Sequence, residues 1–502
     1  MAGRLDEQLL RATVRRHVAR PALAPAADVA DPWRGDEPVR GSRSLPPAPG
    51  KGVRAVARPQ HPSNPLTKTT TRRGFVRTVG LGAALGAVTP LLQACGSGSS
   101  DEVTLTYWTH QYDPAIAVNK RLIKEYQKKN PGVRITYDYV PHANYEQKLF
   151  TALAGGSGPD VFWAGDWLVP QFLENNVLAP VDYAAYGVES KDEFLALFEP
   201  GSLDPYVKGD EVFTGGLSEY EVFSLFYHPQ HLAEAGLPET LPDEPVTWEK
   251  LAQYAGKMAK TKGGKRVRDG IEWEVNNNVW SVLIIEPMVR QLGGELFDEK
   301  AGKPLFTSPE VTEVLQFLQD LGGKHQAIDP GFYTPNSVTQ FFAEERVSMN
   351  IAGPYQPSLI EDTNPKAEYQ AAPLPVFSGG DRTTTMYSWA WFVNAQADEG
   401  KQRAAWEFVE FLTSQGKLWW DEVRYPQARK GKTKGGEDIN EYRKKTSPSY
   451  AVALADYEYG RYQFRSTDYY KIASALQRAQ SRVLQGQDVA AVLQKAQREA
   501  ES

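Results

Sequence analysis

The hydrophobic pattern changes twice along the chain and divides it into a leader and a body. Residues 1–66 show no sustained apolar period and are rich in Pro, Ala and Arg. A short apolar run then extends from Val79 to Ala94. From residue 101 onward, apolar positions recur with the periods of strands and helices. We therefore expect residues 1–66 to be a disordered leader or a misassigned start, and a folded body from residue 101.

The first part of the body alternates short β-rich runs with amphipathic segments. The pattern predicts strands over 103–108, 133–137 and 160–163, with helices over 116–129 and 145–153 between them. Strand–helix–strand–helix order is typical of a parallel sheet. The sequence therefore predicts an α/β fold.

The rest of the body contains more helices. The pattern predicts extended segments over 222–227 and 386–393, and helices over 248–260, 280–292, 309–321, 401–413, 468–485 and after Gly486. The polar segment 426–448 is expected to be a mobile loop. No repeat is visible at a spacing of 20–50 residues, which argues against a solenoid or a propeller.

Charge separates the same two regions. Residues 1–94 hold 15 Lys and Arg against 6 Asp and Glu, which leaves 41 basic and 56 acidic residues in 95–502. An acidic body argues against a nucleic-acid partner. The single cysteine, Cys95, excludes an intrachain disulfide and a multi-cysteine metal site. No apolar run reaches the length of a membrane-spanning helix.

The segment before the body has the features of an export signal. Residues 67–94 contain a twin-arginine element, Thr71–Arg77, followed by the short apolar run. The run ends in Leu92-Gln93-Ala94-Cys95, which resembles a bacterial lipoprotein processing box. We expect cleavage before Cys95, a lipid on that residue, and a flexible tether over 95–100.

Motifs for catalysis are absent from the sequence, since it contains no G-x-S-x-G, Walker or HExxH pattern. His228 and His231 are better explained by a surface turn than by a metal site, and we expect neither a metal nor another cofactor. Glu219 and Glu221 lie two apart, so on a strand they share a face. Such a pair suits glycoside hydrolysis or the binding of hydroxyl groups, and the sequence does not separate the two.

Aromatic residues gather near the predicted strand ends. Trp108 ends the first strand, Trp163 and Trp167 bracket the end of the third with Asp166 between them, and Trp389 lies in a late extended segment. Ligands of α/β sheets bind beyond the carboxyl ends of strands. Aromatic faces stack on sugar rings, and carboxylates accept hydrogen bonds from hydroxyls. This grouping favours a sugar site.

The body resembles the extracellular solute-binding proteins of ABC importers, in the sugar-binding branch that includes maltose-binding protein. Four stretches carry the resemblance, in order: Gly158–Asp166, Ser224–Glu249, Phe341–Tyr355 and Ala404–Thr413. It covers essentially all of 101–502. The resemblance implies a two-lobed α/β fold of type II, with hinge crossovers and a ligand cleft between the lobes. It also implies that the protein is not an enzyme.

The resemblance further implies a set of ligand-binding residues. Trp163 and Asp166 match a stacking aromatic and a hydroxyl-binding carboxylate, and Glu221 matches a ligand carboxylate with Glu219 beside it. The full set is Trp108, His110, Tyr112, Trp163, Asp166, Trp167, Glu219, Glu221, Trp280, Tyr355, Trp389 and Tyr470.

We expect lobe 1 to comprise 101–218 and about 391–440, and lobe 2 to comprise 219–390 and about 441–502. The expected function is capture of a sugar or oligosaccharide by cleft closure and delivery to an ABC permease, by a monomer held on the extracytoplasmic face of the cell membrane through Cys95. Two alternatives remain open, a secreted glycoside hydrolase and a binding protein for a non-sugar such as a polyamine.

Overall fold

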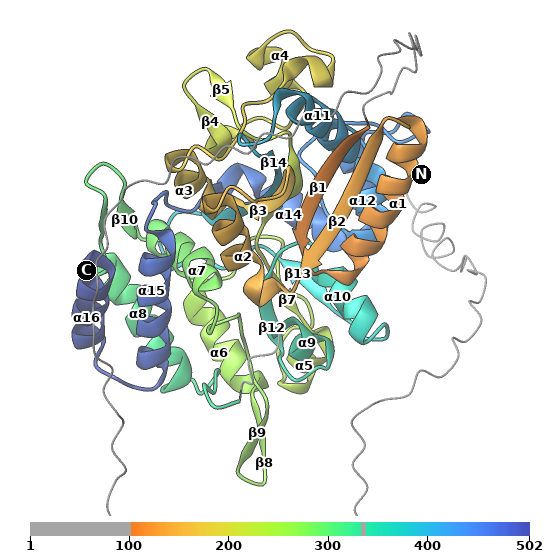
Figure 1. Ribbon diagram of the computed structural model, residues 1–502. Coiled ribbons are helices and arrows are strands. Elements are labelled where there is room, and N and C mark those ends of the chain that lie inside the picture. Colours follow the sequence, from red (N-terminus) through yellow and green to blue (C-terminus); the bar gives the residue numbers. More distant parts are fainter. Residues whose placement is uncertain (1–101, 333–337) are drawn as a thin grey trace, which may run out of the picture. The chain divides into compact units, whose positions relative to one another are not determined.

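The main sheet contains the three strands predicted near the start of the body. The computed structural model describes residues 102–332 and 338–502 (Figure 1). In this part of the chain, six strands form one sheet in the order β15-β14-β3-β1-β2, with β6 beside β14. Their bounds are β1 Val103–His110, β2 Val133–Val140, β3 Val161–Gly165, β6 Leu217–Val222, β14 Thr384–Val393 and β15 Gly460–Tyr462.

The pairing in this sheet is mixed. Strand β1 is parallel to β2 and to β3, as the strand–helix order predicts. Strand β14 is antiparallel to β3 and to β6, and parallel to β15. All ten residues of β14 are buried, so this strand forms the centre of the body.

Helices α1 and α2 connect the first strands. Helix α1 (Asp113–Lys129) has an acidic residue in its first turn and two lysines in its last, which complements the helix dipole. It buries one apolar face and ends where Asn130-Pro131-Gly132 breaks the pattern. Helix α2 spans His142–Ala154 and leads into β3. Both helices agree with the predicted ones to within a few residues.

A smaller sheet and a group of helices make up the rest. Strand β7 (Ser224–Tyr227) lies between β12 (Met349–Ala352) and β13 (Gln370–Ala372), antiparallel to both. Helix α15 (Tyr469–Leu484) packs against α7, α8 and α16, which lie beside it in Figure 1. The other helices of eight or more residues are α6 Trp248–Met258, α7 Asn278–Gln291, α8 Pro309–Gly322, α10 Gln356–Thr363, α11 Glu399–Thr413, α12 Gly416–Val423, α13 Ile439–Thr446, α14 Pro448–Asp456 and α16 Val489–Glu501. The shorter elements are α3 Val169–Glu174, α4 Lys191–Ala196, α5 Pro229–Glu234, α9 Val338–Ala343, β4 Val207–Lys208, β5 Glu211–Val212, β10 Phe297–Asp298 and β11 Lys303–Pro304.

The predicted loop over 426–448 is wrong in its second half. Helix α13 begins at Ile439, where the Asp438 side chain accepts hydrogen bonds from two backbone N–H groups. Arg443 of this helix is buried and donates to the Gln427 carbonyl oxygen at 3.0 Å. The polar groups of this segment form hydrogen bonds within the protein. Its polarity alone therefore did not indicate a loop.

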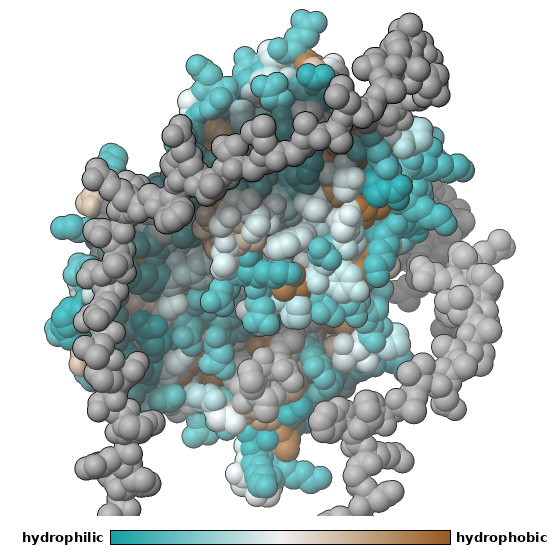
Figure 2. Space-filling view, viewed as in Figure 1, coloured by the Kyte–Doolittle hydropathy of each residue, from teal (hydrophilic) through white to brown (hydrophobic). Residues whose placement is uncertain are grey.

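Two further features differ from expectation. Residues 260–268 form a hairpin, β8 (Lys260–Lys262) and β9 (Lys265–Arg268), whose polar surface lies at the lower edge of Figure 2. The predicted surface turn at His228 and His231 is wrong, because both side chains are buried. The His228 ring nitrogens lie 2.7 and 2.8 Å from the Glu368 and Phe342 carbonyl oxygens. These histidines therefore serve packing.

The predictions for residues 1–66, 67–94 and 95–100, including the lipid on Cys95, lie outside the described residues. The lobe boundaries also stay a prediction. In the part of the chain that the structure describes, no helix is both long enough and apolar enough to cross a membrane.

Candidate functional site

Strand β6 places two glutamates side by side in the interior. Glu219 and Glu221 are buried, and the period of a strand puts both on one face. Tyr387, which pairs with Glu221 across β6 and β14, donates from its hydroxyl to Glu221 Oε2 at 2.9 Å. The same hydroxyl lies 3.4 Å from Glu219 Oε2. Both carboxylates therefore lie within hydrogen-bonding distance of the same phenol oxygen, that of Tyr387.

Further tyrosines complete the surroundings of this pair. Tyr425 hydrogen-bonds to Glu219. Its ring stacks on that of Tyr112, with centroids 5.6 Å apart and an interplanar angle of 20°. The Tyr112 hydroxyl lies 2.8 Å from Ser358 Oγ in α10. This contact joins the segment after β1 to a helix more than two hundred residues later.

Burial makes both carboxylates weak acids. Loss of hydration raises the pKa of Glu219 to about 8, and the hydrogen bonds from Tyr425 and Tyr387 oppose that shift. Burial also raises the pKa of Glu221 well above its usual value, with the Glu219 charge acting in the same direction. The pair therefore holds at least one proton at neutral pH when no ligand is bound.

The link between β12 and α10 approaches the pair closely. A Cβ placed on Gly353 would lie 2.2 Å from Glu221 Oε2, so only glycine leaves room for the carboxylate. Tyr355, two residues later, is half-buried, and burial raises the pKa of its hydroxyl, with added effects from Glu274, Glu221 and Glu219. The Trp280 ring, also half-buried, lies 6.1 Å from the Tyr387 ring. Tyr355 thus lies near the carboxylates, and Trp280 lies beside the Tyr387 ring, whose hydroxyl bonds to them. Their part in ligand binding stays a prediction.

Trp163 lies in a packed environment. Its side chain has 0% exposure and its indole N–H donates to Ser218. Strand β3 lies between β1 and β14, and a ring from each neighbour stacks on it: His110 at 5.0 Å and Trp391 at 6.2 Å. This environment is that of a core tryptophan, and the predicted stacking of Trp163 on a ligand stays a prediction.

Asp166 also belongs to the framework. Its carboxylate has 0% exposure and accepts from the Ser388 backbone N–H at 2.9 Å and from Gln463 at 3.4 Å. Arg465 forms an ion pair with it at 3.2 Å and donates to its carbonyl oxygen at 2.6 Å. Protein donors satisfy both oxygens, and Asp166 connects β3 to β14 and to the segment after β15. Its predicted contact with a ligand stays a prediction.

Trp167 and Tyr470 bond to each other. The Trp167 indole N–H donates to the Tyr470 hydroxyl at 2.8 Å. The Trp167 ring folds back over Gly165, where a Cβ would lie 2.3 Å from it. Its edge meets the Trp389 ring at 5.3 Å, with an interplanar angle of 87°. Trp389, Trp167 and Tyr470 therefore form one aromatic cluster.

His110 and Trp108 stand at the end of β1. The His110 ring lies 4.6 Å from the Trp389 ring, and burial together with His142 lowers its pKa to about 3. The His110 ring is therefore neutral at physiological pH and packs as an aromatic ring. Trp108 is half-buried, and the Lys148 ammonium lies 4.3 Å from its ring centroid. None of the described contacts places Trp108 beside Glu219 or Glu221.

Sequence reasoning missed Tyr387 and Tyr425. Tyr387 could have been found, because it lies two residues before Trp389 on a predicted extended segment and so shares its face. Tyr425 had no such signal, since it follows α12 and lies between the predicted helix over 401–413 and the predicted loop over 426–448, where no element is predicted.

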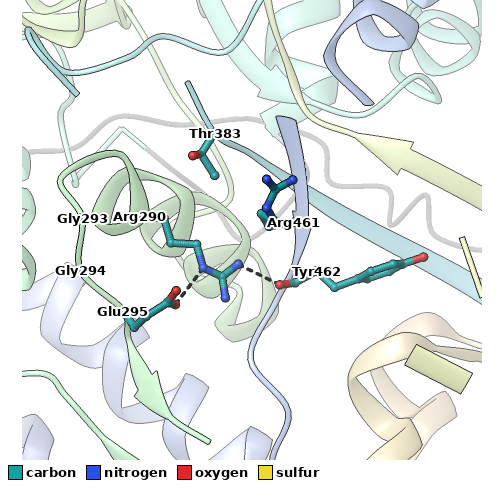
Figure 3. A pocket seen from close by; sticks show the side chains of 7 residues that line it. All are labelled: Arg290, Gly293, Gly294, Glu295, Thr383, Arg461 and Tyr462. Carbon is teal, nitrogen blue, oxygen red and sulfur yellow. Dashed lines mark hydrogen bonds and ion pairs between the residues drawn. The ribbon is translucent and has the colours of Figure 1, made fainter. Parts of the chain in front are cut away.

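A separate hollow of about 340 Å³ is lined by Arg290, Gly293, Gly294, Glu295, Thr383, Arg461 and Tyr462 (Figure 3). Arg290 lies 2.8 Å from Glu295 Oε2 and 2.8 Å from the Tyr462 carbonyl oxygen, so its donors are already used. Among the described residues, no group of three or more His, Cys, Asp or Glu side chains could hold a metal ion. The carboxylate pair and its aromatic border remain the best candidate for a ligand site.

A family model named bacterial extracellular solute-binding protein matches residues 115–417, which is more than half of the chain. The chain therefore belongs to this family. Among known proteins, a maltotriose-binding protein of Pyrococcus abyssi is 25% identical over 325 residues, 64% of this chain and 63% of the relative. An erythritol/L-threitol-binding protein of Mycolicibacterium smegmatis is 22% identical, over 72% of this chain and 82% of the relative. The chain thus spans less than two thirds of the length of the first of these relatives.

Solved structures show the same fold. An ABC transporter solute-binding protein of Thermotoga lettingae bound to α-D-tagatose has a TM-score of 0.68 and 23% identity, covering 79% of this chain and 98% of that protein. Maltose-bound MalE3 of T. maritima has a TM-score of 0.66 and 22% identity, covering 80% of this chain and 99% of that protein. These likenesses confirm the predicted two-lobed α/β fold of a solute-binding protein.

Proposed function

We propose that this protein captures a sugar or oligosaccharide in a cleft bordered by Glu219, Glu221, Tyr355 and Trp280, and delivers it to an ABC permease. The observation that carries the proposal is the buried carboxylate pair with aromatic rings around it. Carboxylates accept hydrogen bonds from sugar hydroxyls, and ring faces pack on the apolar faces of sugars. Relatives whose names include maltotriose-binding and multiple sugar-binding proteins support this ligand class.

Closure of the two lobes would be the working motion. A ligand that contacts residues from both lobes binds the closed state better and so increases its population. Tyr112 and Ser358 already bond across the segments that would close, at 2.8 Å. The loaded, closed form would then dock on the permease.

Attachment to the membrane would use Cys95. The processing box around this residue follows a twin-arginine segment that includes Arg72 and Arg73. A diacylglyceryl group with an added acyl chain exceeds the two signals needed for stable anchoring. The body would thus stay close to the permease on the extracytoplasmic face.

A screen of melting temperature against a sugar library tests the ligand class. A ligand at 100 times its dissociation constant stabilises the folded state by about 2.7 kcal/mol, which is measurable. The proposal expects at least one sugar to raise the melting temperature. It fails if no sugar does so while a polyamine does.

A glycoside hydrolase is the second candidate, because the two carboxylates lie close enough to share a phenol. The protein is incubated with oligosaccharides at concentrations that saturate binding, and the solution is then assayed for new reducing ends. This experiment separates the two functions. Binding without new reducing ends is the expected result.

A further inference from the structure

The carboxylate pair on β6 lacks a positive partner. Several other buried carboxylates of the body each pair with an arginine: Asp166 with Arg465, Asp269 with Arg266, Glu286 with Arg290 and Asp456 with Arg382. None of the ion pairs among the described residues includes Glu219 or Glu221. The groups that act on these two carboxylates are tyrosines and each other. Within the described parts of the chain, two acids therefore lie together without a cation beside them.

One oxygen of the pair also lacks a hydrogen bond. Glu221 has 0% exposure, and its Oε2 accepts from Tyr387. Its Oε1 is buried and has no hydrogen-bond partner among residues 102–332 and 338–502. A buried acceptor without a donor is costly, and native proteins rarely keep one without a functional reason. The Glu221 Oε1 atom is thus an acceptor that the described residues leave open.

Neutral hydroxyls satisfy only part of what this pair requires. A hydroxyl donates one hydrogen bond and supplies no positive charge, so it does not offset the cost of ionising both buried carboxyls. A protonated amine donates up to three hydrogen bonds and also supplies the missing charge. The aromatic rings of Tyr387 and Trp280, 6.1 Å apart, can add attraction between the cation and their faces.

We propose that the ligand of this cleft is a sugar that carries a protonated amine, and that the amine binds between Glu219 and Glu221. This inference rests on the proposed function, because it adds a charge to the sugar ligand. The ammonium donates to Glu221 Oε1 and to Glu219, and the sugar ring packs on the aromatic border. The Tyr387 hydroxyl keeps its place against Oε2 of both glutamates.

The test uses matched pairs of sugars that differ at one group. Glucosamine is compared with glucose, galactosamine with galactose, mannosamine with mannose, and the β-1,4-linked glucosamine dimer with cellobiose. Spermidine is the amine without a sugar. Melting temperature gives the first screen of the full protein at pH 7, and titration calorimetry then gives dissociation constants for each pair in which one member binds.

We expect at least one amino sugar to bind about tenfold or more tightly than its neutral counterpart. In Glu221→Gln, which keeps the shape and removes the charge, the preference should fall to about twofold or less. Glu295→Gln is the matched control, because it removes one carboxylate charge outside this pair, beside Arg290, and should leave the preference unchanged. The Glu221→Gln variant is expected to fold, because the neutral amide has nearly the shape of the protonated carboxyl that burial favours.

Three results would overturn the inference. A neutral sugar that binds as tightly as its amino counterpart, or more tightly, refutes it and leaves the proposed function standing. An unchanged preference in Glu221→Gln refutes the placing of the amine. Binding of spermidine with no sugar of either kind, or no binding by any probe, contradicts both the inference and the proposed sugar function.

Discussion

Truncation of Trp163 separates a framework role from a ligand role. The structure gives this side chain 0% exposure, with His110 and Trp391 stacked on it and a hydrogen bond to Ser218. Trp163→Ala would leave a large cavity in the centre of the main sheet. Removal of a buried Trp costs about 3–5 kcal/mol of stability. The Ser218 hydroxyl keeps its own bond to the Trp389 carbonyl oxygen at 3.0 Å, so no buried donor is left unpaired.

Urea unfolding followed by circular dichroism measures that loss, and titration calorimetry measures affinity for a sugar found in the screen. Trp163→Phe keeps a ring and loses the N–H, so it should cost less than the alanine variant. Trp280→Ala is the contrasting variant, since this half-buried ring lies beside Tyr387, whose hydroxyl bonds to the carboxylates. It should lower sugar affinity about 30- to 150-fold, which corresponds to about 2–3 kcal/mol. Full stability with lost sugar binding in Trp163→Ala would refute the reasoning.

Three further predictions follow from the same contacts. Asp166→Asn should destabilise the protein by about 3–5 kcal/mol, because Arg465 loses the charge it pairs with. Urea unfolding measures this loss, and an unchanged midpoint would argue against the ion pair. Glu219 has a folded pKa of about 8 against an ordinary 4.5, so the folded state favours the protonated form. The stabilisation that protonated Glu219 gives the folded state is complete below about pH 4.5 and is lost as the pH rises toward 8. Over that range the free energy of unfolding should fall by up to about 1.4 kcal/mol per pH unit, and Glu219→Gln should reduce this slope. Equal slopes in both proteins would contradict this. Cys95→Ser should release the body or leave an unprocessed precursor, whereas a membrane-bound variant of wild-type mass would exclude the lipid.

Much of the first sheet could be predicted from the sequence. Segments 103–140 alternate strand and helix patterns clearly, because each element buries one face and ends at a breaker such as Asn130-Pro131-Gly132. The hairpin over 260–268 could not be predicted in this way. It consists largely of charged and glycine residues and has no apolar alternation.

The site was only partly within reach of the sequence. Glu219 and Glu221 share a face because of strand periodicity, and this needs no tertiary information. Trp163 was misplaced because β3 continues to Gly165, so the residue lies within the strand and not at its end. The partners of Asp166 come from Ser388 and Arg465, more than two hundred residues away. Such long-range contacts leave no local pattern.

Small-angle scattering of the protein with and without a bound sugar tests the central claim most directly. If the ligand contacts both lobes and stabilises the closed state, the radius of gyration should be smaller at saturation than in the free protein. The sugar concentration is set from the dissociation constant measured by calorimetry. An identical radius at saturation would contradict capture by closure of the cleft.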